Sequence, residues 1–381
     1  MPEAAPLAGI TVVELATTIA GPYAGTILAG LGARVIKIES AKSGDPFRHL
    51  GGARIDGLPA NFQALNGGKA SVRADLSDPA QVEAVRQLAV AEADVVLQNM
   101  RPGTVERLGL GAADLLEAKP GLVYCNLGAY GREGPMRHLP GYDPLMQAFG
   151  GIVALTGTEA EPARVGISLI DMGTGMWAAL GILSALLRRA ESGRGGIVDV
   201  SLFETALAYM GLAITNYEAD GTIPERTGLR GPFVAPNRAF EAADGLLVIA
   251  VVSDAQFRRL AEALELPALA KDPRFASTVA RLANEAALTG EIGAIIKGRG
   301  REDWSRRLNA ADVPNAPVQG LDEVVDHAQT LATGLLSARG QDPARFVGLP
   351  VSLDGARMSV DEPAPELGRD DQLLLPFVNP D

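Results

Sequence analysis

Asp171 stands in the stretch GISLIDMGTGMWAALG, where a single carboxylate interrupts an otherwise apolar run. A carboxylate in apolar surroundings is costly unless a partner or a reaction makes use of it. Asp171 could cap the N-terminus of the apolar helix that follows. Alternatively, the positive field at a helix N-terminus would keep it ionised, and Gly173 and Gly175 would leave room for a ligand. Asp171 could then attack an activated carbonyl and form a covalent intermediate. The residues alone leave both roles open.

A second group of polar residues lies in the stretch NMRPGTVERLGLG, at and just past the end of a predicted strand. Open α/β sheets bind ligands at the carboxyl ends of their strands, which is where Asn99, Arg101 and Arg107 fall. Arg101 and Arg107 could bind phosphate groups. They could equally be ordinary solvated arginines of a surface loop.

Other chemistries find little support. The only histidines, His49, His138 and His327, lack a metal-ligand spacing, so we expect no metal site. Ser201 has no G-x-S-x-G context, which argues against a serine hydrolase. Glu39 ends a predicted strand where a dinucleotide-binding fold places its ribose-binding acid, but the preceding AGPYAG loop lacks the G-x-G-x-x-G pattern. NAD binding is therefore disfavoured.

Strands and helices must alternate to position these residues. Predicted strands cover residues 10–16, 34–40, 94–100, 121–131 and 196–204, and predicted helices cover residues 20–33, 78–93, 111–120 and 174–189. This rhythm is typical of a parallel α/β sheet. The helix over residues 174–189 is apolar on nearly every side, so we expect it to be buried.

The pattern changes after about residue 220, where a stretch rich in Gly and Pro leads into a smaller α+β unit. A strand over residues 244–252 and helices over 254–266, 278–298 and 302–310 are predicted there. The chain of 381 residues, 47% of them hydrophobic, is long enough for two domains.

The composition also restricts partners and location. The net charge of −12 argues against nucleic acid, which needs a basic surface. The sequence has no run of about 18 apolar residues, so we expect no membrane span. The acidic start MPEAAPLAGITVVELA does not resemble a signal peptide. Cys125 is the only cysteine, so no internal disulfide can form, which suits a reducing cytoplasm.

Taken in order, several stretches resemble the class III coenzyme A transferases (the CaiB/BaiF family, with formyl-CoA transferase and carnitine-CoA transferase). The resemblance covers nearly the whole chain. It is carried by LAGITVVELATTIAGPYAGTILAGLGARVIKIESAKSGDPFR, NGGKASVRADL, VLQNMRPGTVERLGL, VYCNLGAYGREGP, PGYDPLMQAFGG and GISLIDMGTGMWAALGILSALLRRAESGRG, then by DGLLVIAV, DPRF and PAPELG.

The resemblance implies roles for particular residues. Asp171 falls on the aspartate that accepts the acyl group. Met100 stands where an aromatic residue is usual, and Ser40 stands where some members have an arginine near the CoA phosphates. The glycine-rich lid loop of the formyl-CoA enzymes has no obvious counterpart, so oxalate is not implied as the substrate. The implied CoA contacts are Thr18, Ile19, Ala74, Asp75, Leu76, Asn99, Met100, Arg101, Arg107, Leu139, Pro140, Gly141, Tyr142 and Asp143.

The resemblance also implies a fold and an assembly. We expect an α/β protein with a large Rossmann-like open-sheet domain over residues 1–224, to which residues 319–381 return. A small α+β domain would span residues 225–318. Members of the family form a homodimer of two interlocked rings. No cofactor beyond coenzyme A as a substrate is implied, and no metal.

The implied reaction moves CoA from an acyl-CoA thioester to a small carboxylic acid through an aspartyl anhydride and an aspartyl-CoA thioester. The closest rival of the same fold is a 2-methylacyl-CoA racemase, which needs two acid/base groups facing one carbon. Racemases resemble GHD where this chain has GYD, so Tyr142 replaces their histidine. A tyrosine with a pKa near its usual value of about 10 is a poor base at neutral pH. His138, four residues upstream, keeps the racemase open, and a non-catalytic CoA-binding protein is a third possibility.

Overall fold

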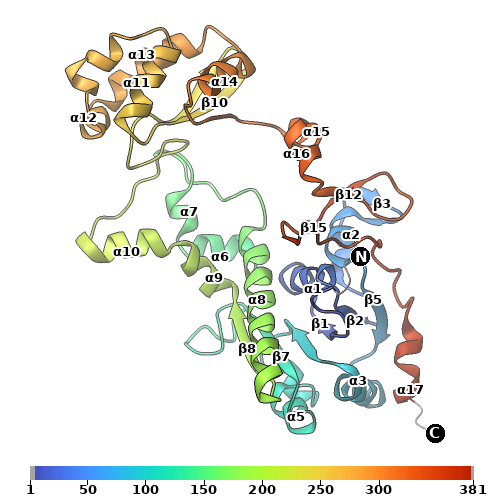
Figure 1. The fold of residues 1–381 in the computed structure, drawn as a ribbon. Coiled ribbons are helices and arrows are strands. Elements are labelled where there is room, and N and C mark those ends of the chain that lie inside the picture. Colours follow the sequence, from blue (N-terminus) through green and yellow to red (C-terminus); the bar gives the residue numbers. More distant parts are fainter. Residues whose placement is uncertain (1–4, 379–381) are drawn as a thin grey trace. The chain divides into compact units, whose positions relative to one another are not determined.

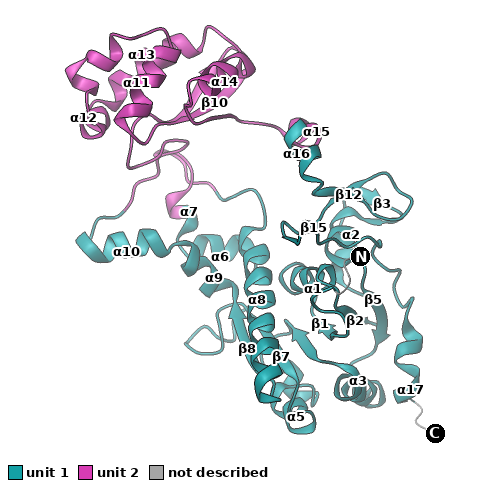
Figure 2. Ribbon diagram, viewed as in Figure 1, with its two compact units in different colours: residues 1–153, 164–223, 328–381 teal, residues 154–163, 224–327 magenta. Residues whose placement is uncertain are grey.

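The computed structural model describes residues 5–378, which form two compact units (Figures 1 and 2). The larger unit contains the described residues up to Val153, Arg164–Ile223, and those from Ala328 onward. The smaller unit contains Ala154–Ala163 and Pro224–His327. The smaller unit thus includes a short segment from within the first 224 residues.

A six-stranded parallel sheet forms the centre of the larger unit. Its order is β5-β2-β1-β6-β7-β8. The strands are β1 (Thr11–Leu15), β2 (Arg34–Ser40), β5 (Ala70–Ala74), β6 (Val95–Gln98), β7 (Val123–Gly128) and β8 (Gly196–Ser201). The chain builds the sheet outward from β1 in one direction, then returns to build it in the other. The order therefore reverses between β1 and β6, and such a switch point opens a crevice at the carboxyl ends of the strands.

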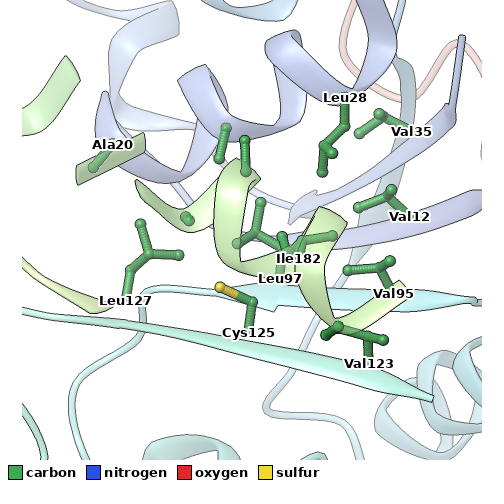
Figure 3. Packing of buried hydrophobic residues seen from close by; sticks show 14 of the residues in the cluster. Val12, Ala20, Leu28, Val35, Val95, Leu97, Val123, Cys125, Leu127 and Ile182 are labelled. Carbon is green, nitrogen blue, oxygen red and sulfur yellow. The ribbon is translucent and has the colours of Figure 1, made fainter. Parts of the chain in front are cut away.

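Helices cover both faces of this sheet. α1 (Ala20–Gly30) and α8 (Leu169–Ser192) pack on one face, and α3 (Pro79–Glu92), α5 (Ala112–Ala118) and α17 (Leu375–Val378) pack on the other. Figure 3 shows Leu28 of α1 near the strand residues Val35 and Val12, and Ile182 of α8 near Leu97. The near-continuous apolar strands follow from this double coverage, since both faces are buried.

The chain's C-terminal part closes the β5 edge of the sheet. The carboxylate of Asp370 accepts a hydrogen bond from the Ser71 amide at 2.9 Å, and that of Asp371 accepts one from the Arg73 amide at 2.8 Å. These bonds satisfy amides that an edge strand would otherwise leave unpaired.

α8 departs from the prediction of a buried helix. Gly175, Ala178 and Ile182 are buried on its inner side, but Met176, Trp177 and Leu180 on its outer side are exposed. The prediction fails because the described chain supplies packing partners on only one side of the helix. Among residues 5–378, α8 is also the single helix that length and apolar composition would allow to cross a membrane.

The smaller unit is α+β. Its antiparallel sheet has the order β11-β10-β9, with β9 (Asn237–Ala242), β10 (Gly245–Ala250) and β11 (Asn315–Pro317). Four helices, α11 (Asp254–Ala263), α12 (Thr278–Ala283), α13 (Glu285–Ile296) and α14 (Arg301–Ala310), enclose a separate apolar core. The prediction of a single helix over residues 278–298 is wrong, because the helix is interrupted at Asn284, between the end of α12 and the start of α13.

The remaining elements are short connections and surface pieces. They are η1 (Pro46–Arg48), β3 (Arg54–Ile55), β4 (Leu58–Pro59), α2 (Ala60–Asn66), α4 (Thr104–Arg107), α6 (Asp143–Phe149), α7 (Ile152–Leu155), α9 (Leu202–Tyr209), α10 (Gly211–Asp220), η2 (Leu269–Lys271), η3 (Pro273–Phe275), α15 (Leu321–Asp326), α16 (Ala328–Thr333), β12 (Leu336–Ala338), β13 (Arg345–Val347), β14 (Ser352–Leu353), β15 (Ala356–Arg357) and η4 (Asp371–Leu373).

Candidate active site

A pocket of about 480 Å³ lies at the switch point of the large sheet, and Asp171 lines it. The pocket gathers the loops that follow β1, β2, β6 and β7 and the starts of α6 and α8. Its lining consists of Thr17, Thr18, Ile19, Ala20, Pro46, Phe47, Asn99, Met100, Arg101, Pro102, Leu127, Gly128, Ala129, Leu139, Pro140, Gly141, Tyr142, Asp143, Pro144, Ser168, Asp171 and Leu202.

Asp171 does not cap α8, so the capping prediction is wrong. The helix begins at Leu169 after Ser168, and Asp171 is its third residue. Asp143 provides the cap instead, although it lies at the start of α6. Its Oδ2 accepts hydrogen bonds from the amides of Ile170, at 2.7 Å, and Asp171, at 3.2 Å. Because Asp143 satisfies these amides, the Asp171 side chain is not needed for capping.

Burial and the neighbouring Asp143 carboxylate raise the pKa of Asp171 from its ordinary value of 3.8 to about 7. Burial is the larger cause, since a charged carboxylate loses hydration in a half-buried position. The expectation that the helix field keeps Asp171 fully ionised is therefore wrong. A carboxyl group that titrates near neutrality is typical of a catalytic position.

The glycines after Asp171 serve helix packing rather than ligand access. A Cβ on Gly175 would come within 2.7 Å of the Ala20 carbonyl oxygen in α1. A Cβ on Gly173 would collide with the Tyr209 hydroxyl of α9. The prediction that these glycines make room for a ligand is wrong, because neighbouring helices fill the space.

Asn99 joins the two loops at the switch point. Its side-chain amide donates to the Thr17 carbonyl at 2.8 Å and accepts from the Thr17 amide at 3.0 Å. The loops after β1 and β6 are therefore joined into one wall of the pocket, and Asn99 acts on that wall through the backbone of Thr17.

Most of the sequence-predicted contacts lie together in this pocket. The lining includes Thr18, Ile19, Asn99, Met100, Arg101 and Leu139–Asp143. Ala74, Asp75 and Leu76 lie at the end of β5, outside the lining. Arg107 also lies outside it, in α4, where its guanidinium donates to the Thr104 hydroxyl at 3.3 Å.

Sequence reasoning missed Pro46 and Phe47, which η1 brings into the lining. The sequence does contain a signal for this turn. Asp45 precedes a proline, a typical N-cap arrangement, and its carboxylate accepts from the Phe47 amide at 2.9 Å. Glu39, weighed above as a ribose-binding acid, is instead buried against Arg48, with which it forms an ion pair at 2.6 Å.

A second cavity of about 760 Å³ lies at the ends of β6, β7 and β8. It shares Met100, Pro102, Leu127 and Gly128 with the Asp171 pocket. His138 lines this second cavity, whereas Tyr142 lines the Asp171 pocket. Within residues 5–378, no group of three His, Cys, Asp or Glu side chains is arranged to hold a metal ion.

The chain is similar to known proteins over most of its length. The family model described as CoA-transferase family III matches residues 7–371. The acetyl-CoA:oxalate CoA-transferase of Acetobacter aceti is 35% identical over 352 residues, covering 92% of this chain and 90% of the relative. The succinyl-CoA–D-citramalate CoA-transferase of Chloroflexus aurantiacus is 42% identical over 291 residues, covering 76% and 72% respectively.

Among solved structures, a CaiB/BaiF family protein from Brucella suis superposes with a TM-score of 0.90 at 35% identity. The match covers 99% of this chain and 100% of that protein. The match therefore includes residues of both units. This chain belongs to CoA-transferase family III.

Proposed function

We propose that this protein transfers CoA from an acyl-CoA thioester to a free carboxylic acid, with Asp171 as the covalent nucleophile. The observation that carries the proposal is a carboxyl group with a pKa of about 7 in the lining of the switch-point pocket. A carboxylate that has lost part of its hydration is a stronger nucleophile than one in water. Membership of the family and the names of the relatives support the reaction type.

In the first half of the reaction, the Asp171 carboxylate attacks the thioester carbonyl, and the carbon–sulfur bond breaks. This yields a mixed aspartyl anhydride and the CoA thiolate. The thiolate then attacks the Asp171 carbonyl carbon and releases the donor as a free carboxylate. CoA is now held as an aspartyl thioester.

In the second half, the acceptor carboxylate attacks the aspartyl thioester and frees the thiolate again. The thiolate attacks the acceptor carbonyl of the new anhydride, giving acceptor acyl-CoA and the original Asp171 carboxylate. Every intermediate keeps one acyl group activated, so no separate energy source is needed.

Each attack places negative charge on a carbonyl oxygen, which hydrogen-bond donors must stabilise. The loop after β1 supplies backbone amides at the pocket. The Ile19 amide has no hydrogen-bond partner within residues 5–378, which leaves it available to such an oxygen. Arg101 in the same lining carries a positive charge that suits a phosphate of CoA.

The lining gives the racemase no matching support. Racemisation needs a second acid/base group beside the substrate carbon. The pocket presents Tyr142 at the position of the racemase histidine, and His138 lines the neighbouring cavity instead. Non-catalytic CoA binding would not require a carboxyl group with a raised pKa in the lining.

We further propose a homodimer in the cytoplasm. The outer side of α8 and the adjoining α9 and α10 expose a large apolar surface, which a second copy of the chain would cover. The exposed apolar side chains there are Met176, Trp177, Leu180, Leu187, Leu207, Tyr209, Leu212, Ile214 and Tyr217. A single buried, unpaired cysteine suits a reducing compartment.

The proposal is tested by covalent trapping. The protein is incubated with a panel of acyl-CoA donors, treated with hydroxylamine, and digested for mass spectrometry. A hydroxamate on the peptide that contains Asp171, absent in Asp171→Asn, is the expected result. An Asp171→Asn enzyme that still exchanges CoA at a rate comparable to wild type would refute the mechanism.

A further inference from the structure

The loop after β1 holds an unusual backbone conformation next to the pocket. Thr18 has a φ of 69°, in the left-handed region. A β-branched residue rarely adopts this conformation, and it persists only where the surroundings enforce it. Thr18 lines the pocket between Thr17 and Ile19, so its conformation determines how this wall faces Asp171.

A buried carboxylate holds Thr18 in place. The Thr18 amide donates to both carboxylate oxygens of Asp45, each at 3.3 Å. Asp45 has no exposed surface, and its carboxylate also accepts from the Phe47 amide at 2.9 Å. One side chain thus joins two separate stretches of the lining, the loop after β1 and the turn after β2.

A buried lysine in turn holds Asp45. The ammonium of Lys37 lies 2.9 Å from Asp45 Oδ2, 2.8 Å from Glu14 Oε1 and 2.7 Å from the Ala16 carbonyl oxygen. These three contacts use all three donors of the ammonium group. Lys69 pairs with the other oxygen of Glu14 at 2.8 Å, so two cations balance two carboxylates.

The cluster formed by Glu14, Lys37, Asp45 and Lys69 is expensive to bury. Removing charges from water costs free energy that ion pairing often fails to recover, so stability alone gives little reason to keep such a cluster. It lies directly behind a pocket wall whose backbone conformation is rare. The geometry therefore indicates that the cluster serves to hold the backbone of this wall in its rare conformation.

We propose that Asp45 is a positioning residue for CoA transfer: held by Lys37, it fixes Thr18 in the left-handed conformation and so places the Thr17–Ile19 loop in the pocket that Asp171 lines. This inference rests on the proposed function. Asp45 does not line the pocket, so it acts through the loop rather than on the substrate.

The test compares two matched aspartates. Asp78 also precedes a proline and also caps a helix, its carboxylate accepting from the Ala80 amide at 3.0 Å, but it contacts neither Thr18 nor Lys37. Asp45→Asn and Asp78→Asn are each mixed with acyl-CoA, and the single-turnover rate of Asp171 loading is measured by quenching and mass spectrometry. Circular dichroism at the assay temperature confirms that each variant is folded.

We expect Asp45→Asn to slow loading at least about tenfold, because small displacements of positioning groups cost large factors in rate. Asp78→Asn should load within about twofold of wild type. A folded Asp45→Asn that loads at the wild-type rate would overturn the positioning role. Loss of transfer in Asp171→Asn would in that case leave the proposed function standing.

A second pair of variants keeps the test open if Asp45→Asn does not fold. Thr18→Pro removes the amide that Asp45 binds and forces φ to about −65°, while Thr18→Ala keeps the amide. Neither changes a side chain of the buried cluster. We expect Thr18→Pro to slow loading at least about tenfold more than Thr18→Ala. Equal losses in the two variants would show that only the Thr18 side chain matters, which would overturn the proposal.

Discussion

Replacing Asp171 with Asn should abolish transfer and at the same time stabilise the protein at alkaline pH. The raised pKa means that the folded state binds the Asp171 proton more tightly than the unfolded chain does. The folded protein therefore loses stability as pH rises from the ordinary pKa of 3.8 toward the folded value of about 7. Asn carries no proton and escapes this loss.

The size of the effect follows from the pKa. A displacement from 3.8 to about 7, at about 1.36 kcal/mol for each pH unit, corresponds to roughly 4 kcal/mol above pH 7 as an upper limit. Asp171 is only half-buried, so we expect about 2–4 kcal/mol at pH 8. At pH 4.5 only about 1 kcal/mol or less of this difference should remain, and below about pH 3, where both states of the wild-type chain are protonated, it should vanish.

Urea unfolding at pH 8 and pH 4.5 measures this difference. Trp177 lies on α8 two turns from Asp171, and Trp304 is the only other tryptophan. A Trp304→Phe background therefore makes the fluorescence report on the unit that contains the site. Activity is followed in the same samples by the exchange of CoA between a donor and an acceptor acid.

Asp114 supplies the matched control. It is the third residue of α5, as Asp171 is of α8, but it is exposed. Asp114→Asn should lose only a small helix-dipole contribution of about 0.5 kcal/mol and keep full activity. An Asp171→Asn protein that is less stable than wild type at pH 8 would refute the reasoning, because it would mean that the carboxylate contributes to folding.

Three further predictions concern the titration, the CoA site and the assembly. Loading of Asp171 should rise with pH around an apparent pKa of about 7, and Asp143→Asn should move that rise to lower pH by removing a like charge; an unchanged profile would contradict the role of Asp143. Arg101→Ala should weaken CoA binding in calorimetry by about 1–3 kcal/mol, and Arg107→Ala should weaken it less; the reverse order would place the phosphates near α4. Leu180→Asp should shift sedimentation from dimer to monomer, whereas a wild-type chain that is monomeric at micromolar concentration would refute the dimer.

Several features of the fold were predictable from local pattern. The alternation of strands and helices predicts the parallel sheet, and the stretch from Arg34 to Ser40 forms β2 over those same residues. These features follow from residue periodicity and turn residues, which act over a few positions. Asp171 is conspicuous at the same level, since one carboxylate in an apolar run is visible without a structure.

The rest of the site depends on residues that are far apart in the chain. Asp143 caps α8 from a different helix, and it also contributes to the raised pKa of Asp171. No residue near Asp171 in the sequence indicates that Asp143 is its partner. The exposed outer side of α8 was also missed, because an apolar helix shows its composition in the sequence but not which neighbours cover it.

The sequence by itself determined the order of elements and the class of the fold, because periodicity is a local property. It also singled out Asp171 as an unusual carboxylate, while the role of nucleophile came from the family resemblance. Only the tertiary structure decided that α1 packs closely against Gly175, and that the Asp45 carboxylate accepts a hydrogen bond from the Thr18 amide. It also decided that the pKa of Asp171 lies near neutrality. Each of these depends on side chains that the fold brings together from distant positions. The burial of a side chain and its interactions with charges depend on distances in space, and these distances cannot be read from the linear order of residues.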